Sequence, residues 1–279
     1  MYQSTISSFL NLKVDTSIIP KKSVNVPEII IKDFKTNSNF ESNDTLFILF
    51  DIETTGRSVY QDRICQIAAR IWNIDRDGEV EEEDDDAASF SAFMNPNYPM
   101  STGAYKTHHI DKHSYICEPS FKDIITQWNN WIQKQCISRK KQNIMFLAHN
   151  GKLFDFKLVI VELFRYNLVT SDCNFFNKSG IFLCDSLRLF RIWYPELKSK
   201  SLNNLHLEFF KSNIENNHDA MGDVNAMHKL LQYVKDGNPT YFQTIRTIVE
   251  KYDDLLKEMD KTLLKRKSIL CPKIKYSDS

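Results

Sequence analysis

The 279-residue sequence lacks several features that would assign it to a common protein class. No apolar stretch approaches the ~18 residues that a membrane-spanning helix needs, so we expect no membrane partner. The start of the chain lacks the charged and then apolar plan of a secretory signal. There are 7 glycines, with neither a G-x-G-x-x-G nor a G-x-x-x-x-G-K pattern, so no dinucleotide or P-loop site is predicted.

Neither the cysteines nor the overall charge indicates a particular kind of site or partner. The six cysteines are widely spaced without a C-x-x-C pair, which predicts reduced thiols of an intracellular protein, not a zinc site or a disulfide frame. Lys and Arg total 36 and Asp and Glu total 36, so no overall basic field indicates nucleic acid. The run Glu79–Asp86 holds seven of the acids, which leaves 29 acids against 36 basic residues, a net charge of +7, in the remainder.

What is present is typical of a globular chain, with 42% hydrophobic and 26% charged residues. We divide it into a flexible leader at 1–43, a main domain at 44–236, and a C-terminal helix with a basic tail at 237–279. The leader is polar, with one short strand expected at Ile29–Ile31. The run Glu79–Asp86 is expected to lie in a long hairpin loop, on a solvated surface or as a partner-binding loop.

Apolar runs and apolar periodicity predict alternating strands and helices after residue 44. The expected strands are Leu46–Phe50, Ile64–Ile71, Ser89–Met94, Asn143–Ala148 and Gly180–Cys184. The expected helices are Pro119–Cys136, Asp155–Tyr166, Asp185–Trp193, Ser201–Phe210, Asp219–Val234 and a single long helix at Tyr241–Lys267. Three leading strands followed by alternating helices and strands predict an α/β class with a mixed sheet.

Two carboxylates end the first apolar run, in the segment Phe50-Asp-Ile-Glu-Thr-Thr-Gly56. Residues two apart in a strand point the same way, so Asp51 and Glu53 face one side. Two anions side by side at the end of an apolar strand suit a hard cation such as Mg²⁺ or Mn²⁺. The alternative for this pair alone is a turn cap at Asp51 and a solvated Glu53.

Two later segments add acids in comparable places. Asp155, in Ala148-His-Asn-Gly-Lys-Leu-Phe-Asp-Phe156, follows an expected buried strand and opens a helix. His218 and Asp223 lie five residues apart in Asn217-His-Asp-Ala-Met-Gly-Asp223, at the start of an amphipathic helix. If His218 lies before the helix and Asp223 one turn in, both can face one cleft. Taken singly, each has an ordinary reading as a charge or hydrogen-bonding group at a helix start.

In combination these segments resemble the DEDD 3′→5′ exonucleases of the histidine subtype. Asp51-x-Glu53 matches the first motif of that family, Asp155 in His-Asn-Gly-x-x-x-Asp the second, and His218-x-x-x-x-Asp223 the third. The second motif is closest to the three-prime repair exonuclease branch. The resemblance implies an RNase H-like fold, with a mixed, mostly five-stranded sheet flanked by helices and a C-terminal helical extension.

The resemblance also implies a mechanism with two bound Mg²⁺ or Mn²⁺ ions. Asp51 is expected to bridge both ions, Glu53 and Asp223 to complete the first site, and Asp155 to hold the second. His218 is expected to deprotonate the attacking water, and the product would be a nucleoside 5′-monophosphate.

Substrate contacts follow from the same motifs. Backbone around Thr54 and Thr55 is expected to hold the 3′-terminal nucleotide, and Asn150 and His108 border the cleft.

A second feature lies at the front of the chain. Gln3-Ser-Thr-Ile6-Ser-Ser-Phe9-Leu10 has the spacing of sliding-clamp ligands, with Leu10 where a second aromatic is usual. Ile6, Phe9 and Leu10 would form an apolar plug and Gln3 would enter a polar pocket. If the chain binds a sliding clamp, we expect the protein in a nucleus or at a viral replication site. Without that contact, the expected location is the cytoplasm. The alternative is an ordinary disordered leader.

We therefore predict a metal-dependent DNA 3′→5′ exonuclease that acts on single-stranded or frayed ends in repair or replication. Two alternatives stay open at this point. One is an RNA exonuclease of the same superfamily, because a preference for the 2′-hydroxyl cannot be read from these residues. The other is a non-catalytic module that binds nucleic acid or a sliding clamp.

Overall fold

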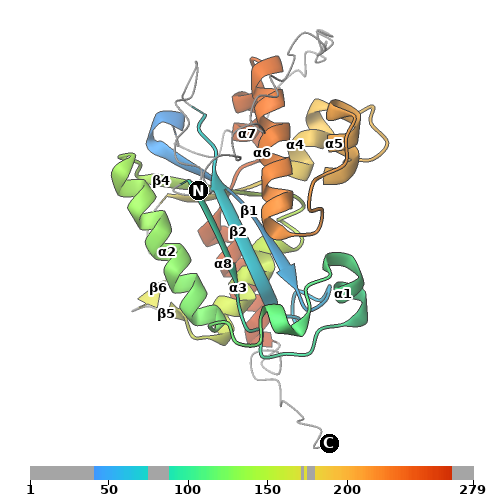
Figure 1. The fold of residues 1–279 in the computed structure, drawn as a ribbon. Helices are drawn as coiled ribbons and strands as arrows, with labels where there is room; N and C mark the ends of the chain where they lie inside the picture. Colours follow the sequence, from blue (N-terminus) through green and yellow to red (C-terminus); the bar gives the residue numbers. More distant parts are fainter. Residues whose placement is uncertain (1–40, 75–87, 171–172, 175–179, 266–279) are drawn as a thin grey trace, which may run out of the picture.

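The computed structural model describes residues 41–74, 88–170, 173–174 and 180–265 (Figure 1). Within these ranges six strands form one sheet in the order β3-β2-β1-β4-β7-β8. Their bounds are β1 (Thr45–Thr54), β2 (Ile64–Ile71), β3 (Ser89–Phe93), β4 (Asn143–Ala148), β7 (Ile181–Asp185) and β8 (Glu250–Lys251). β1 pairs parallel with β4, and β4 with β7, whereas the other pairs are antiparallel. The predicted α/β class and mixed sheet are confirmed, with β8 as a sixth strand.

Helices cover both faces of this sheet. Those described are α1 (Thr102–His108), α2 (Phe121–Ser138), α3 (Asp155–Arg165), α4 (Ser186–Trp193), α5 (Leu202–Phe210), α6 (Ala220–Gly237), α7 (Tyr241–Ile248) and α8 (Tyr252–Lys265). A separate two-stranded sheet joins β5 (Val169–Thr170) to β6 (Cys173–Asn174), and two 3₁₀ turns lie at Ser42–Asp44 and Lys112–Ser114.

The central strand β1 is buried on both faces, as its continuous apolar run predicts. Ile48 and Phe50 pack with α2, α3 and α8 in one hydrophobic cluster. Phe47 and Leu49 pack in a second cluster with α4, α5, α6 and α7. The side chains of β1 therefore alternate between two helical layers, and its odd-numbered residues face the layer that contains α6.

The main domain otherwise follows the predicted boundaries closely. The strand at Asn143–Ala148 is found as predicted, and Ser120 caps α2 by accepting a hydrogen bond from the Asp123 N–H at 3.4 Å. The helix α6 runs on to Gly237, beyond its predicted end at Val234. The short helix α1 was not predicted.

The single long helix predicted at Tyr241–Lys267 is wrong. The chain forms α7, turns to extended backbone at Val249 (φ −62°, ψ 138°), pairs with β7 through β8, and then forms α8. Ile245 and Ile248 of α7 pack in the cluster of α6, whereas Leu255 and Met259 of α8 pack in the cluster of α2 and α3. The strand pairing carries the chain from one face of the sheet to the other, which overrides the local helical pattern.

Several predictions lie outside the described residues. These are the strand at Ile29–Ile31, the acidic run Glu79–Asp86, the peptide with Gln3, Ile6, Phe9 and Leu10, and the basic tail from Arg266 onward. Among the helices that the structure describes, none is long and apolar enough to cross a membrane.

Candidate metal centre and active site

Two carboxylates continue the odd-numbered register of β1 beyond its apolar part. Phe47 and Leu49 pack toward α6, so Asp51 and Glu53 emerge on that same face of the sheet. Figure 1 shows α6 lying along β1 and β2, and its first turn carries Asp223. The alternation of one strand thus aims both acids at a third acid from a helix 170 residues later in the chain.

The three acids form a compact cluster. One ligand atom from each of Asp51, Glu53 and Asp223 lies within 4.8 Å of the others. Among the described residues, the buried Oδ1 atom of Asp223 has no hydrogen-bond partner. A buried oxygen without a partner is unfavourable unless a cation or another donor reaches it. The cluster and this oxygen therefore fit the hard oxygen ligands that Mg²⁺ and Mn²⁺ prefer.

Asp155 lies beside this cluster, at the first turn of α3. It is 4% exposed, and the backbone N–H of Ile52 in β1 lowers its pKa against the effect of burial. Its charge is the strongest of the neighbouring charges that raise the pKa of Asp51. Burial, opposed by the backbone N–H groups of Asp155 and Ile52 and reinforced by the charge of Asp185, raises the pKa of Asp155 to about 7.

The pKa values of the other acids are also raised. Burial, and then repulsion from Asp155 and Asp223, raises the pKa of Asp51 well above its usual value. Burial and the same two neighbours raise the pKa of Glu53 to about 8. Among the described residues, every charge that shifts these two pKa values is another carboxylate, including Asp219. Close anions without a nearby cationic side chain are the electrostatic arrangement that a bound divalent ion relieves.

His218 lies at the rim of the cluster. It is exposed and adopts a left-handed backbone with φ of 66°. The charge of His218 and its backbone N–H both oppose the rise in the pKa of Asp223 that burial causes. The structure thus brings His218 to the same acid that completes the cluster, with its imidazole on the solvent side.

Thr54 and Thr55 lie where β1 leaves the sheet, and both are buried. The Thr54 hydroxyl donates to the Gly56 carbonyl at 2.7 Å, and the Thr54 carbonyl is 3.1 Å from Nε2 of His108. The Thr55 N–H donates to the Arg63 carbonyl at 2.9 Å. These groups therefore fix the shape of the loop that follows Glu53.

His108 is positioned beneath this loop, 8% exposed. Its Nδ1 accepts the Ile110 N–H at 3.0 Å, so its Nε2 carries the proton that the Thr54 carbonyl accepts. Burial lowers the pKa of His108, which keeps the ring in this neutral form. His108 therefore supports the loop through both ring nitrogens.

Asn150 belongs to the turn between β4 and α3, where it adopts a φ of 68°. Its N–H donates to Oδ1 of Asp185 at 3.0 Å, and the Lys152 N–H donates to Oδ2 of the same carboxylate at 3.3 Å. Asp185 is 5% exposed and also caps α4 through the Leu187 N–H at 2.9 Å. This acid holds the turn that places Asp155.

Sequence reasoning did not identify Asp185, although the signal was present. It is the last residue of the buried strand β7 and directly precedes α4, so it ends an apolar run as Asp51 does. A second missed group is a buried ion cluster beneath the loop after β1. Glu162, 1% exposed, pairs with Arg165 and lies 3.7 Å from Nε of Arg63, while Arg165 donates to the carbonyl of Asp62 at 2.8 Å.

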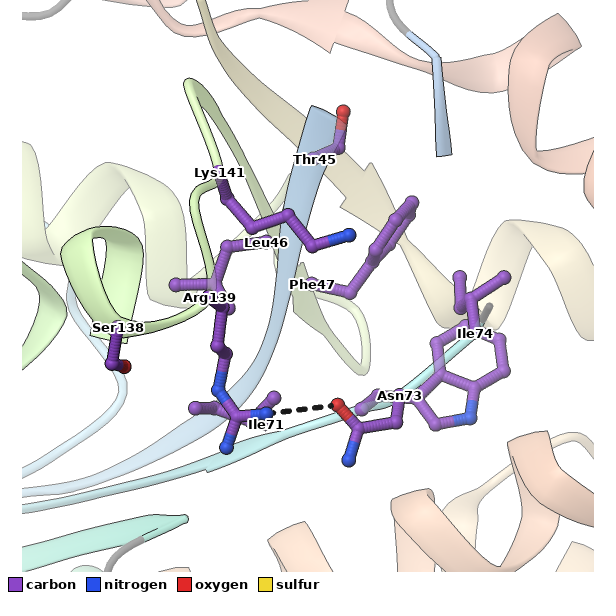
Figure 2. A pocket seen from close by; sticks show the side chains of 10 residues that line it. Thr45, Leu46, Phe47, Ile71, Asn73, Ile74, Ser138, Arg139 and Lys141 are labelled. Carbon is purple, nitrogen blue, oxygen red and sulfur yellow. Dashed lines mark hydrogen bonds between the residues drawn. The ribbon is translucent and has the colours of Figure 1, made fainter. Parts of the chain in front are cut away.

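The four carboxylates do not line either of two cavities that lie elsewhere in the described part of the chain. The larger, about 1080 Å³, lies between residues 95–102, Tyr105 of α1 and residues 110–116. The smaller, about 360 Å³, lies at the start of β1, at the other end of the strand from Asp51 and Glu53. Figure 2 shows its lining, in which Arg139 and Asn73 lie 3.5 Å apart in a hydrogen bond.

Comparison with protein families gives a match that spans the whole cluster. Residues 48–231 match the RNase_T family, described as exonuclease, so the four carboxylates and His218 all lie inside the match. The chain is 27% identical over 218 residues to the DNA polymerase III PolC-type of Clostridium perfringens, covering 77% of this chain and 13% of that protein. It is 28% identical over 191 residues to the same-named protein of Bacillus subtilis, covering 68% and 11%. The chain therefore corresponds to a small part of these relatives.

Solved structures show the same fold. A zinc-bound complex of Escherichia coli ExoI with single-stranded DNA superposes with a TM-score of 0.52 at 22% identity, covering 72% of this chain and 42% of that one. Cell-death related nuclease 4 superposes with a TM-score of 0.54 at 17% identity, covering 69% and 64%. At these identities the likeness concerns the fold, and it confirms the predicted RNase H-like architecture.

Proposed function

The chain belongs to the exonuclease family, and on this premise we propose that it is a DEDD 3′→5′ exodeoxyribonuclease that releases nucleoside 5′-monophosphates from DNA. The observation that carries the proposal is the convergence of Asp51, Glu53 and Asp223 within 4.8 Å, with Asp155 beside them. Such a cluster is costly without a cation and suits phosphodiester hydrolysis, which depends on positioning and charge neutralisation.

The residues present fit two divalent ions. Asp51, Glu53 and Asp223 would hold one ion, and Asp51 with Asp155 the other. When bound, two Mg²⁺ or Mn²⁺ ions would stabilise the charge on the attacking and leaving oxygens of the phosphodiester. The buried Oδ1 of Asp223 would gain the partner that the described residues do not supply.

His218 supplies the proton acceptor in this proposal. Its imidazole stands at the exposed rim of the cluster, where it takes the proton of the attacking water. The Asp219 carbonyl accepts the Asp223 N–H at 3.0 Å, and Asp219 directly follows His218, so the position of the base is tied to that of a metal ligand. Histidine suits this task because its unperturbed pKa, near ~6.5, allows proton transfer close to neutral pH.

The 3′-terminal nucleotide would rest on the loop that follows Glu53. Thr54 and Thr55 shape this loop, and His108 fixes it from below. Asn150 borders the other side of the cluster, in the turn that precedes Asp155. The assignment of this chain to the three-prime repair exonuclease branch, which rests on the sequence of that turn, stays a prediction.

We favour DNA over RNA because the named relatives are DNA polymerase III PolC-type proteins and an ExoI complex with single-stranded DNA. The sliding-clamp contact through Gln3, Ile6, Phe9 and Leu10 also stays a prediction, as does a nuclear or viral replication site. An Ile6→Ala/Phe9→Ala double variant should lose retention on an immobilised clamp and keep oligonucleotide hydrolysis. Retention equal to that of the parent protein would remove the clamp proposal.

The function is tested with 5′-labelled and 3′-labelled DNA and RNA oligonucleotides in Mg²⁺ or EDTA. A 3′→5′ exonuclease gives a ladder of shortened products from the 5′-labelled strand and releases the 3′ label at once as a nucleoside 5′-monophosphate. Asp223→Asn should abolish both, whereas Glu118→Gln, at an exposed acid, should not. Faster digestion of RNA would favour the RNA exonuclease. A folded protein that binds oligonucleotides and shortens neither polymer would be a binding module.

A further inference from the structure

The first turn of α6 is held in place by a side chain of the neighbouring strand β2. Gln66 is 2% exposed and lies directly opposite Glu53 in the antiparallel pairing of β1 and β2. Its Nε2 donates to Oδ1 of Asp219 at 2.7 Å, and its Oε1 accepts the Ala220 N–H at 3.2 Å. Both ends of the Gln66 amide are thus used to fix the position at which α6 begins.

Asp219 completes the connection from the other side. It is the N-cap of α6, and its Oδ2 accepts the Gly222 N–H at 3.2 Å while its Oδ1 accepts from Gln66. Its neighbours in the chain are His218 on one side and, one helical turn later, Asp223. Any movement of Asp219 therefore displaces both the proposed base and a proposed metal ligand.

The loop before α6 leaves little room for adjustment. A Cβ at Gly222 would lie 2.3 Å from the Asn216 carbonyl oxygen and 2.9 Å from that of Glu215, so the loop packs directly on the helix backbone. The Asp223 N–H donates to the Asp219 carbonyl at 3.0 Å. A shift of α6 relative to β2 would therefore move His218 and Asp223 by nearly the same amount.

An N-cap alone does not require this arrangement. Asn and Ser cap helices as well as Asp does, without adding a charge next to three other acids. The additional property of Asp219 is that it accepts a charge-assisted hydrogen bond from the amide that faces Glu53. Because β2 pairs with β1, the two residues connect the sheet that presents Asp51 and Glu53 to the helix that presents Asp223.

We propose that Gln66 and Asp219 are a positioning pair that sets the distance of Asp223 and His218 from Asp51 and Glu53. The inference rests on the proposed function, because it assigns these residues to the geometry of the same site. Neither residue touches substrate in this account. They act through the first turn of α6.

The test is a double-mutant cycle that reverses the hydrogen bond. Gln66→Glu loses the Nε2 donor and places a second carboxylate against Asp219. Asp219→Asn keeps a capping residue and gives up one of the two acceptor interactions. In the double variant Gln66→Glu/Asp219→Asn, the amide of residue 219 donates to the carboxylate of residue 66, and the charge of the pair equals that of the parent protein. Asn225→Ala is the matched control, because Asn225 of α6 accepts a bond from Arg70 of β2 at 3.0 Å at an exposed place farther along the same contact.

Two readouts are measured on the full chain. The first is the dissociation constant for Mn²⁺ alone, which does not depend on hydrolysis. The second is kcat and KM on a 5′-labelled DNA oligonucleotide. We expect Gln66→Glu to weaken Mn²⁺ binding and to lower kcat, each by about tenfold or more, with KM within about threefold. The reason is that loss of a residue that holds a metal ligand in place typically costs about 10–100-fold in metal affinity or activity. Asp219→Asn should show a smaller loss of both, and the double variant should recover each to within about threefold of the parent.

Several outcomes would overturn the inference. They are single variants that bind Mn²⁺ as the parent does, losses that add in the double variant without recovery, or an equal loss in Asn225→Ala. If Gln66→Glu does not fold, the comparison of Asp219→Asn with the double variant decides in the same way. If the parent protein binds Mn²⁺ and hydrolyses no oligonucleotide, the proposed function fails, whereas the Mn²⁺ cycle still decides on the positioning pair.

Discussion

We predict that repulsion within the cluster of acids destabilises the metal-free protein. Burial and repulsion raise the pKa of Glu53 from 4.5 to about 8. Below about pH 4.5 Glu53 is protonated in both the folded and the unfolded chain, so its raised pKa does not lower the free energy of unfolding there. As the pH rises from about 4.5 to about 8, the unfolded chain ionises first, and the free energy of unfolding falls across this window.

The size of the effect follows from the same values. Each tenfold change in proton affinity corresponds to about 1.36 kcal/mol, so the shift at Glu53 sets a ceiling of about 5 kcal/mol. Glu53 is partly exposed, and Asp51, Asp155 and Asp223 still repel one another when Glu53 is neutral. Substitution of Glu53 alone should therefore recover only a part of that ceiling in the free energy of unfolding, about 2 kcal/mol. We therefore expect Glu53→Gln to raise the midpoint of thermal unfolding by about 4–8 °C, since about 1 kcal/mol corresponds to about 2–4 °C at this size.

The assay is thermal unfolding in EDTA at pH 4 and pH 8.5, and again at pH 8.5 in Mg²⁺. The gain from Glu53→Gln should appear at pH 8.5 in EDTA and nearly vanish at pH 4. In Mg²⁺ the parent protein should gain more than the variant, because the ion binds the folded state through that carboxylate. Glu118→Gln, at an exposed acid, serves as the control. An equal gain at both pH values, or none at pH 8.5, would refute the electrostatic reasoning.

Three further predictions concern single residues. His218→Asn should lower kcat by about 10²–10⁴-fold and leave Mn²⁺ affinity within about threefold, because it removes a general base and no ligand; a proportional loss of Mn²⁺ binding in titrations would contradict this. Asp185→Asn should lower kcat by about tenfold or more, because one oxygen that accepts from the turn holding Asn150 is replaced by a donor; single-turnover digestion measures it, and a parent-like rate argues against the role of the turn. Glu162→Gln should reduce stability by about 3 kcal/mol in urea unfolding, because it leaves Arg165 buried without its counter-charge; an unchanged midpoint would contradict the importance of this ion cluster.

Much of the fold and the carboxylate set could be predicted because they depend on local patterns. A strand alternates its side chains with a period of two, so Asp51 and Glu53 had to face the same side wherever β1 lay. The resemblance of their segments to the exonuclease motifs, not the strand pattern, grouped Asp155 and Asp223 with these two acids before any coordinates were known.

The supporting contacts could not be predicted because they depend on register and on packing between distant segments. Gln66 and Asp219 are 153 residues apart, and only the pairing of β2 with β1 together with the placement of α6 brings them within 2.7 Å. The helix α1 escaped notice because its seven residues show no apolar stripe, with His108 as its buried residue. Its start depends on a cap at Ser101, whose N–H donates to the Thr55 carbonyl at 2.8 Å.

The two-residue strand β8 has a consequence for any shortened form of this protein. Phe182 and Leu183 of β7 pair with Lys251 and Glu250, which occupy the outer side of the sheet. A chain ending near Gly237 would leave the backbone of β7 open to other molecules, and bare edges of this kind recruit strands from neighbouring copies. Such a fragment would retain every proposed ligand and still tend to polymerise edge to edge, so its insolubility would say nothing about the chemistry of the site.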